Sequence, residues 1–519
     1  MTKTTLLAMS FEGLENVEVG RLQAFLSENG YESESIQLDG NKDIDQNYTL
    51  LDLNSRVYAM YEYAESSVYP ESILCFAQLA KKIKAEIADS IIVLGSKFPS
   101  IYYKEILGDE RFSGIDYIIL GESEYTLASL IDCVEKNDDI SEFVATHKNI
   151  ASKASMDNKE ILNININELP LPDRSFLYNK NFGNYYAFIY DSHGCTMKCS
   201  FCTRGQFYKF TGRSAESLFT EIEKITTESP IKCFWFTGGS GGSFEDPGGE
   251  LGVKKIRDLC NLIIEDNLKV SMRVYLRSNF VAKVDIDLLK LMKKAGIHVA
   301  LVGVESGNEY DLNLLKKGTN VQNNRITLKM LKEAGIYSDH FGFMMINPYS
   351  TPERLQDNFR FLDEHQPHDL DNYVHHLVVD PGTAIMKRIE NDGLLIPKDD
   401  FLKQGPSYRF MDPFAAEVSE FLHKYFLIYD TETAGISTFV FNLAPFLPHG
   451  KIFEERTTSI MQKRARVYSE YFRMLYLDMD IGSCERKYDE FRSILHSFDK
   501  ELALLKNALV KDLIKFKIM

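Results

Sequence analysis

Short apolar runs alternate with helix-like segments over the first part of the chain. Thr4–Met9, Ile91–Leu94 and Ile115–Leu120 are almost entirely apolar and short, which predicts buried strands. Val17–Asn29 has apolar side chains at helical spacing. Strands that alternate with helices predict a parallel sheet covered by helices on both faces. Ligands of such sheets bind at the carboxyl ends of the strands.

The same alternation returns between residues 181 and 390. The predicted strands there are 185–191, 232–237, 271–277, 298–304, 339–345 and 373–379. Six strand–helix units predict a partial (β/α)6 barrel, because a full barrel of this kind needs eight. After about residue 395 the pattern becomes helical, and 485–516 has one apolar stripe.

These patterns divide the chain into four parts. We predict an α/β protein with a Rossmann-like parallel sheet at 1–135 and a Pro-containing linker at 136–180. A (β/α)6 core at 181–395 and a mainly helical C-terminal domain at 396–519 follow. Functional side chains in such folds lie on the loops after the strands.

Composition and charge narrow the class of protein. The chain has 519 residues, 44% of them hydrophobic and 26% charged, which is the balance of an ordinary globular protein. Its net charge of −16 argues against a protein that binds nucleic acid by broad charge neutralisation, so we expect no nucleic-acid partner. No apolar stretch approaches 18 residues and the start does not resemble a signal peptide. We therefore expect a cytoplasmic protein without membrane contact.

A tight cysteine cluster is the sharpest chemical feature. Cys195, Cys199 and Cys202 fall within eight residues, directly after a predicted strand. Thiolates bind iron–sulfur clusters, and three local ligands leave one iron of a cubane open. A structural zinc site is the alternative, but zinc sites usually pair two halves of ligands and no second half is visible. The spacing favours iron–sulfur chemistry.

The cysteine spacing, with Phe201 before the last cysteine, resembles that of radical S-adenosylmethionine (SAM) enzymes. Thr237-Gly238-Gly239 after the second strand and Glu305-Ser306 after the fourth also resemble segments of that superfamily. The resemblance implies that the three cysteines bind a [4Fe–4S] cluster whose open iron chelates SAM. The SAM contacts that it implies are Phe201, Thr237, Gly238, Gly239, Arg277, Glu305 and Ser306. For Arg277, a solvated surface arginine is the alternative, and no catalytic residue is assigned beyond these cofactor contacts.

The N-terminal part resembles the cobalamin-binding (B12) domain of one radical SAM subgroup. Ile91–Pro99 and Asp116–Leu127 are the segments that carry this resemblance. A cobalt-ligating histidine in a D-x-H-x-x-G motif is absent, as is common in the subgroup, and a scaffolding domain without cofactor is the alternative. The predicted cobalamin contacts are Glu12, Tyr63, Ser66, Gly95, Ser96, Lys97, Gly121 and Glu122.

The resemblance implies a cobalamin-dependent radical SAM methyltransferase. It would act on an unactivated carbon of a peptide or small-molecule natural product, with an external electron donor such as flavodoxin or ferredoxin. A radical SAM maturase that catalyses cyclisation, rearrangement or epimerisation, with or without bound cobalamin, is the first alternative. A tRNA methylthiolating enzyme lacks support because residues 1–150 hold no second cysteine trio. A zinc-stabilised interaction module is the non-enzymatic alternative, and it predicts a colourless protein.

Overall fold

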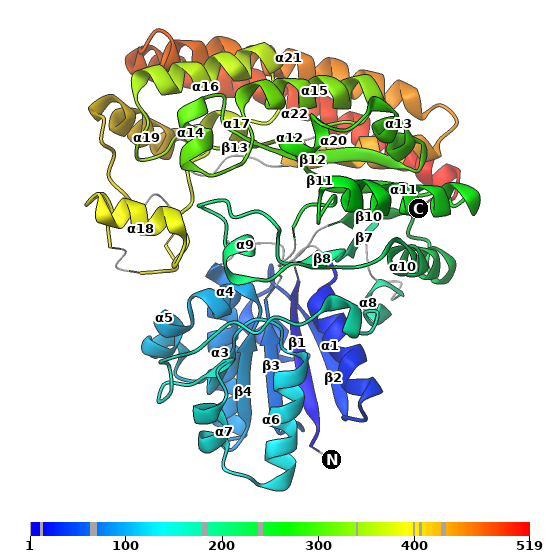
Figure 1. The fold of residues 1–519 in the computed structure, drawn as a ribbon, viewed down its shortest axis with the longest axis vertical. Helices are drawn as coiled ribbons and strands as arrows, with labels where there is room; N and C mark the ends of the chain where they lie inside the picture. Colours follow the sequence, from blue (N-terminus) through cyan, green and yellow to red (C-terminus); the bar gives the residue numbers. More distant parts are fainter. Residues whose placement is uncertain are drawn as a thin grey trace.

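The structure is a computed structural model, and it describes most of the chain. The described residues are 2–10, 14–62, 70–178, 185–236, 242–338, 341–397, 400–403, 407–426 and 432–518. Figure 1 shows an N-terminal unit, a central sheet with its helices, and a layer of C-terminal helices beyond them. Within the described residues, no helix has both the length and the apolar character needed to cross a membrane.

The N-terminal unit is built on a six-stranded sheet of order β2-β1-β3-β4-β5-β6. Its strands are β1 (Thr4–Ser10), β2 (Ser33–Asp39), β3 (Val57–Tyr61), β4 (Ile91–Gly95), β5 (Tyr117–Ile119) and β6 (Ile150–Ala151). The first five run parallel and β6 pairs with β5 in the antiparallel sense. This confirms a Rossmann-like parallel sheet, and it moves the end of the unit from residue 135 to at least 151, since β6 lies in the predicted linker.

Helices cover both faces of this sheet because its strands are apolar on both sides. One face packs against α1 (Val17–Glu28), α6 (Glu124–Lys136) and α7 (Ile140–Thr146). The other packs mainly against α3 (Pro70–Glu86) and α5 (Tyr103–Gly108). The short helices α2 (Ile44–Tyr48) and α4 (Lys97–Ile101) complete the unit, and α4 starts at the carboxyl end of β4.

A parallel sheet of order β13-β12-β11-β10-β7 forms the centre of the molecule. Its strands are β7 (Tyr186–Ile189), β10 (Cys233–Phe236), β11 (Ser271–Arg277), β12 (Ile297–Glu305) and β13 (Phe341–Phe343). The helices of this region are α10 (Ala215–Glu228), α11 (Gly249–Glu265), α12 (Ser278–Val281), α13 (Ile286–Lys294), α14 (Glu309–Leu314), α15 (Val321–Ala334), α16 (Pro352–His365), α17 (Asp371–Val374) and α18 (Ala384–Asn391).

The predicted sixth strand of this core, 373–379, is wrong. Its first residues belong to α17, and only His376 makes an isolated bridge, to Ile346. Within the described residues the central sheet therefore has five strands, in an otherwise correctly predicted core.

The C-terminal part is helical, as predicted. It contains α19 (Pro413–Phe426), α20 (Glu432–Leu443), α21 (Gly450–Tyr476) and α22 (Ile481–Lys515). Apolar residues of α20 pack with Tyr186, Phe188 and Cys233 of the central sheet, while α21 and α22 pack against each other behind it. The C-terminal helices thus cover the face of β7 and β10 that faces away from α10 and α11.

Candidate functional site

The three cysteines lie on a loop between the two domains. The chain leaves β7, forms β8 (Ser192–His193), passes through the cysteine loop and enters α9 (Arg204–Phe207). β8 pairs with β9 (Thr211–Gly212). Gly194 takes a positive φ of 64°, and a side chain there would meet the backbone of Lys209. The loop therefore begins at a turn that favours glycine.

Backbone hydrogen bonds hold the second half of this loop. The amide of Ser200 donates to the carbonyl of Leu315 at 2.8 Å. Gln206 Nε2 donates to the carbonyls of Cys199, Ser200 and Cys202 at 3.1, 3.2 and 2.8 Å. One amide side chain thus ties together the backbone of two of the three cysteines.

The thiols have the donor chemistry that an iron–sulfur cluster needs. Cys199 is buried, and Cys195 and Cys202 are partly buried. Burial, with Asp246 nearby, raises the pKa of Cys195 to about 12, and burial also raises the pKa of Cys199. The ammonium of Lys317 lies near Cys199 and offsets the charge of its thiolate. Across the described ranges, no three potential metal-ligating side chains are already gathered around one point, so the fit rests on the three thiols and their surroundings.

Gly205 makes the close packing of this loop possible. A Cβ there would lie 1.8 Å from the carbonyl oxygen of Met197. Gly205→Ala is therefore expected to displace the loop, to cost about 1–3 kcal/mol of stability and to lower iron binding after reconstitution. The measurements are thermal unfolding and iron content. Gly435→Ala is the control because a Cβ there has open space. Unchanged unfolding and iron content in Gly205→Ala would show that the loop tolerates displacement.

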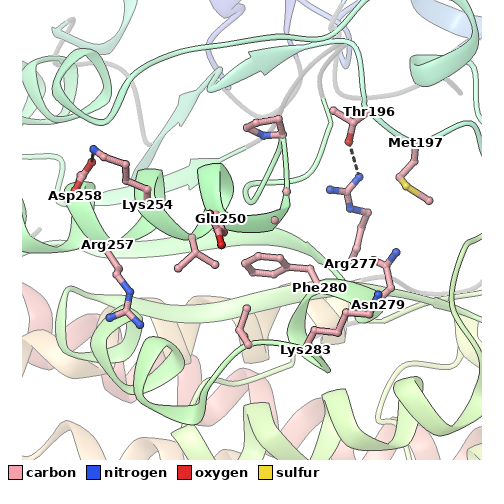
Figure 2. Close-up of a pocket in the computed structure, with 15 residues that line it drawn as sticks. Thr196, Met197, Glu250, Lys254, Arg257, Asp258, Arg277, Asn279, Phe280 and Lys283 are labelled. Carbon is pink, nitrogen blue, oxygen red and sulfur yellow. Dashed lines mark hydrogen bonds and ion pairs between the residues drawn. The ribbon is translucent and has the colours of Figure 1, made fainter.

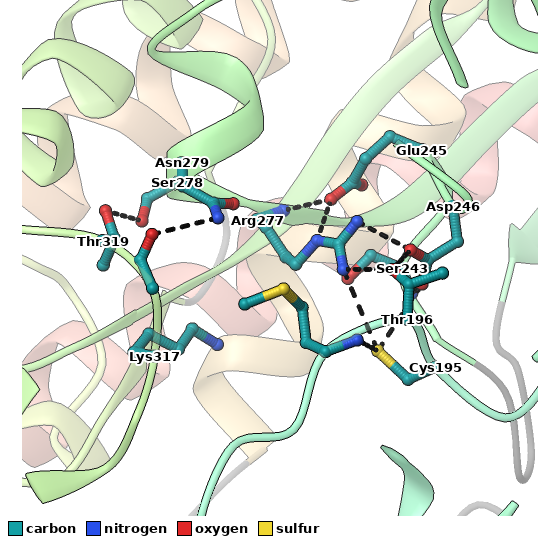
Figure 3. A network of polar contacts seen from close by, with 12 residues as sticks. Cys195, Thr196, Ser243, Glu245, Asp246, Arg277, Ser278, Asn279, Lys317 and Thr319 are labelled. Carbon is teal, nitrogen blue, oxygen red and sulfur yellow. Dashed lines mark hydrogen bonds and ion pairs between the residues drawn. The ribbon is translucent and has the colours of Figure 1, made fainter. Parts of the chain in front are cut away.

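Arg277, predicted to bind the carboxylate of SAM, is held by two buried carboxylates instead (Figure 3). Its Nε donates to Glu245 Oε1 at 2.7 Å, and its Nη2 donates to Asp246 Oδ1 at 2.7 Å. Its Nη1 donates to Thr196 Oγ1 at 3.1 Å and lies 3.9 Å from Cys195 Sγ. All three guanidinium nitrogens are therefore engaged with the loop and its support. The assignment of Arg277 to the carboxylate of SAM stays a prediction, and these contacts show that Arg277 also supports the cysteine loop.

The two predicted SAM contacts at the end of β12, Glu305 and Ser306, have different roles. Glu305 ends the strand with φ +66° and accepts a hydrogen bond from Lys317 Nζ at 2.6 Å. Burial disfavours the ammonium of Lys317, but Glu305 outweighs this and the pKa of Lys317 is raised. Ser306 is fully buried and donates to Asn358 Oδ1 at 2.7 Å. The side chain of Ser306 therefore holds the loop, whereas Glu305 and Lys317 lie beside the cysteines.

The other predicted SAM contacts are placed only in part. Phe201 is partly buried and packs against the apolar cluster that contains Leu315 and Tyr408. Thr237, Gly238 and Gly239 lie outside the described residues. Of the predicted cobalamin contacts, Glu12, Tyr63 and Ser66 lie outside them as well.

Four of the predicted cobalamin contacts do lie at the carboxyl edge of the N-terminal sheet. Gly95 has no room for a Cβ, which would lie 2.2 Å from the ring of Tyr61. Ser96 has φ +83°, and its hydroxyl donates to Glu18 Oε2 at 2.9 Å. The ammonium of Lys97 interacts with Cys202, Arg204 and Asp380 of the central domain, and its burial lowers its pKa. Gly121 has φ +88° and packs against the backbone of Leu162.

Glu122 belongs to a buried ion cluster instead of an open binding edge. Arg21 Nη2 donates to Glu122 Oε2 at 2.8 Å, and Arg21 Nε donates to Glu124 Oε1 at 2.6 Å. Arg21 Nη1 lies 2.7 Å from His193 Nε2, and Glu122 Oε1 lies 2.9 Å from His193 Nδ1. Because a guanidinium only donates, His193 Nε2 accepts. Glu122 as a cobalamin contact stays a prediction, and in the structure its carboxylate joins the N-terminal unit to the strand in front of Cys195.

Four residues of this region are not predicted from the sequence: Arg21, Asp246, Lys317 as an ion-pair partner, and Tyr208. Tyr208 follows α9 and is buried with its hydroxyl bonded to Ser100 of α4, so it also joins the two domains. The only sequence signal for Asp246 is its place after the Gly-rich segment that follows a strand. Nothing in the sequence pattern points to Arg21 or Tyr208.

A cavity of about 670 Å³ lies against the cysteine loop. Figure 2 shows Thr196 and Met197 of that loop at one side, α11 residues such as Lys254 and Arg257 at another, and Phe280 and Lys283 after β11. Arg277 lines this cavity and donates to Thr196 of the loop (Figure 2), and its Nη1 lies 3.9 Å from Cys195 Sγ. The loop is therefore approachable from outside the central sheet.

Comparisons with known proteins agree with this arrangement. The sequence profile of the Radical SAM superfamily matches residues 189–362, which contain the three cysteines, Arg277 and Glu305. An anaerobic magnesium-protoporphyrin IX monomethyl ester cyclase of Cereibacter sphaeroides is 27% identical over 326 residues, which cover 60% of this chain and 50% of that protein. The chain spans about half the length of the curated relatives that lead the comparison.

Two solved structures share the fold over most or all of the chain. The cobalamin-dependent SAM radical enzyme OxsB, solved with aqua-cobalamin and SAM bound, has a TM-score of 0.71 at 17% identity, covering 100% of this chain and 80% of that one. The radical SAM methyltransferase TsrM of Kitasatospora setae, solved with cobalamin and a [4Fe–4S] cluster, has a TM-score of 0.57 at 16% identity, covering 79% and 83%. The profile match and the cysteine loop in its expected place identify residues 189–362 as a radical SAM domain, and the cofactors of that superfamily are a [4Fe–4S] cluster and SAM.

Proposed function

We propose that this radical SAM enzyme is cobalamin-dependent and methylates an unactivated carbon of a peptide or natural-product substrate. The observation that carries the proposal is the approach of the carboxyl edge of the N-terminal sheet to the cysteine loop. Arg21 meets His193 at 2.7 Å, and Lys97 interacts with Cys202. Parallel sheets bind their ligands at this edge, so a cofactor there would lie next to the radical site.

The polar groups at that edge suit the amide side chains of a corrin ring. Glu62 Oε1 accepts from the Phe98 amide at 2.8 Å, and burial raises the pKa of Glu62 well above its usual value. The Lys97 ammonium offers donors, while the Glu62 carboxyl, the Ser96 hydroxyl oxygen and backbone carbonyls offer acceptors. The donor set therefore fits cobalamin, and it contains no described histidine that follows a strand of this sheet.

The residues of the central domain would divide the remaining work. Cys195, Cys199 and Cys202 would hold the cluster, and Glu305 with Lys317 would orient SAM beside it. When bound, the cluster and SAM supply a carbon-centred radical, and cobalamin supplies a methyl group. The protein orients these groups and excludes water from them. The close packing of α20 against the central sheet supports the exclusion of water.

An external one-electron donor is part of this proposal. Thr196 and Lys198 are the exposed residues of the cysteine loop, and the cavity lined by Lys254, Arg257 and Lys283 begins beside Met197. This surface gives a protein such as flavodoxin or ferredoxin a short approach to Cys195.

A radical cyclisation or rearrangement without methyl transfer is the second candidate. It is favoured by the relative of Cereibacter sphaeroides, which is named as a cyclase, whereas TsrM is named as a methyltransferase. The two candidates use the same cysteines, and the second acts with or without cobalamin at the edge of the N-terminal sheet. They differ in whether a methyl group passes from SAM to cobalt.

The test is made on anaerobically purified chain, reconstituted with iron and sulfide, incubated with hydroxocobalamin and desalted. We expect broad iron–sulfur absorption and retained corrinoid bands near one equivalent. The loaded enzyme is then reduced in the presence of SAM that carries a trideuterated methyl group. Labelled methylcobalamin supports the methyltransferase, and 5′-deoxyadenosine without labelled methylcobalamin supports the second candidate. Iron–sulfur absorption without corrinoid would refute the cobalamin proposal, and a colourless zinc protein would refute both candidates.

A further inference from the structure

Asp246 is a buried carboxylate placed against a predicted cluster ligand. Its Oδ2 lies 3.5 Å from Cys195 Sγ, and its Oδ1 accepts from Thr196 Oγ1 and from Arg277 Nη2 (Figure 3). The Ser243 amide donates to Oδ2 at 3.0 Å. Asp246 is fully buried, so its charge acts on Cys195 with little screening by water.

The chain makes room for this carboxylate and holds its cation in place. A Cβ on Gly242 would lie 2.0 Å from Asp246 Oδ2, so a glycine permits the approach. Glu245 Oε1 accepts from both the amide and Nε of Arg277, at 3.1 and 2.7 Å. The guanidinium is therefore fixed with Asp246 on one side and Glu245 on the other, and its Nη1 lies 3.9 Å from Cys195 Sγ.

The network thus aims one negative and one positive group at the same sulfur. Reduction of a cluster adds one negative charge to it, so a carboxylate near a ligand sulfur opposes reduction and a guanidinium favours it. Charges and hydrogen bonds at ligand sulfurs are among the groups that set cluster potentials. A carboxylate at a thiolate ligand has no evident use in binding iron, because it repels the thiolate.

We propose that Asp246 and Arg277 act through Cys195 as an opposed pair of positioning residues that set the reduction potential of the cluster. This inference rests on the proposed function, because it requires a cluster on Cys195. Arg277 moderates the carboxylate, and Thr196 ties both to the loop. The pair keeps the potential of the reduced cluster low enough to donate an electron to SAM while an external donor still reduces it.

The test measures the midpoint potential of the reconstituted cluster by redox titration followed by electron paramagnetic resonance. Asp246→Asn keeps the shape and removes the negative charge, so its potential is expected to rise. Arg277→Gln removes the positive charge, so its potential is expected to fall. Asp311→Asn is the control. This buried carboxylate accepts hydrogen bonds from Ser306, Asn347 and Asn358 and makes none to the cysteine loop among the described contacts. The cluster of this variant is expected to keep the wild-type potential.

Shifts of opposite sign in the two variants support the proposal, because disruption of the loop would move both the same way. Unchanged potentials, or shifts of the same sign, overturn it. If Asp246→Asn does not assemble a cluster, the sign of the shift in Arg277→Gln decides. A wild-type chain with no cluster signal refutes the proposed function itself, and is thereby distinguished from failure of this inference.

Discussion

Replacing Cys199 by alanine is expected to leave the reconstituted chain without a [4Fe–4S] cluster. Cys199 is the most buried of the three cysteines of the loop, and its carbonyl is held by Gln206. Three thiolates are the protein ligands that the loop offers, and two do not retain a cubane with an open iron. Loss of an outer partner of a metal site costs about 10–100-fold in affinity or activity, so loss of a ligand is expected to cost more. The loss of the cluster is measured by the iron–sulfur absorption, the iron content and the cleavage of SAM.

Cys260→Ala is the matched control for this experiment. Cys260 is fully buried in α11 among the apolar side chains of the central core, and it lies outside the loop. This variant is expected to lose some stability and to keep its cluster. A full cluster in Cys199→Ala, or an equal loss of iron in both variants, would contradict the assignment of the loop.

The sequence predicts the cysteine loop well because its ligands are local. Cys195, Cys199 and Cys202 and their preceding strand are close along the chain, so spacing alone carries the chemistry. The ion cluster around Arg21 has the opposite character. Its partners Glu124 and His193 are 103 and 172 residues away, so only folding brings them together. Because these contacts cannot be seen in the sequence, the sequence presents Glu122 only as a carboxylate of a loop at the ligand-binding edge of the sheet.

Arg277 shows a second limit of sequence analysis. Its place at the end of a strand was predicted correctly, and β11 ends there. Its role depends on Glu245 and Asp246, which the loop after β10 brings to it, and no periodic pattern marks such a loop.

Residues 373–379 do not form the predicted strand, because an apolar pattern alone does not make a segment pair with a neighbouring strand. Tyr373 and Val374 are buried on α17, and Asp371 lies 3.0 Å from His375 Nδ1 one helical turn away. Val378 is 52% exposed. The apolar run is thus divided between a short buried helix and an irregular segment in which Leu377 is buried and Val378 is exposed, a distinction that hydrophobicity alone does not make.

Replacing Arg21 by methionine is expected to cause the largest loss of stability. The side chain of Arg21 is 5% exposed, and those of Glu122 and Glu124 are 6% and 2% exposed. Methionine keeps much of the volume and removes the cation that pairs with both buried carboxyl groups. Breaking a buried ion pair in this way costs about 3–5 kcal/mol. Because Arg21 also contacts His193, the variant is expected to loosen the cysteine loop and to lower cobalamin retention.

The loss of stability in Arg21→Met should depend on pH. The direction of this dependence follows from the buried carboxyl groups. Burial, with Glu122 second, raises the pKa of Glu18 to about 8, and Arg21 opposes this. A carboxyl that stays protonated in the folded chain destabilises it increasingly as pH rises above about 4.3, where the unfolded chain ionises. Arg21→Met removes the charge that lowers the pKa of Glu18, so Glu18 stays protonated to higher pH in the variant than in the wild type. The difference in free energy of unfolding between wild type and variant is therefore expected to be smaller at pH 5 than at pH 8.

Arg56→Met is the control for charge and side-chain length. Arg56 pairs with Asp89 in the same N-terminal unit, but their side chains are 40% and 76% exposed. Exposed pairs contribute about 0–1 kcal/mol, so this variant should unfold nearly as the wild type does at both pH values. Urea unfolding followed by circular dichroism compares the three proteins. Equal losses in the two variants, or a loss in Arg21→Met that does not change between pH 5 and pH 8, would show that the buried carboxylates do not depend on Arg21. Arg21 would then contribute no electrostatic link between the N-terminal unit and the cysteine loop.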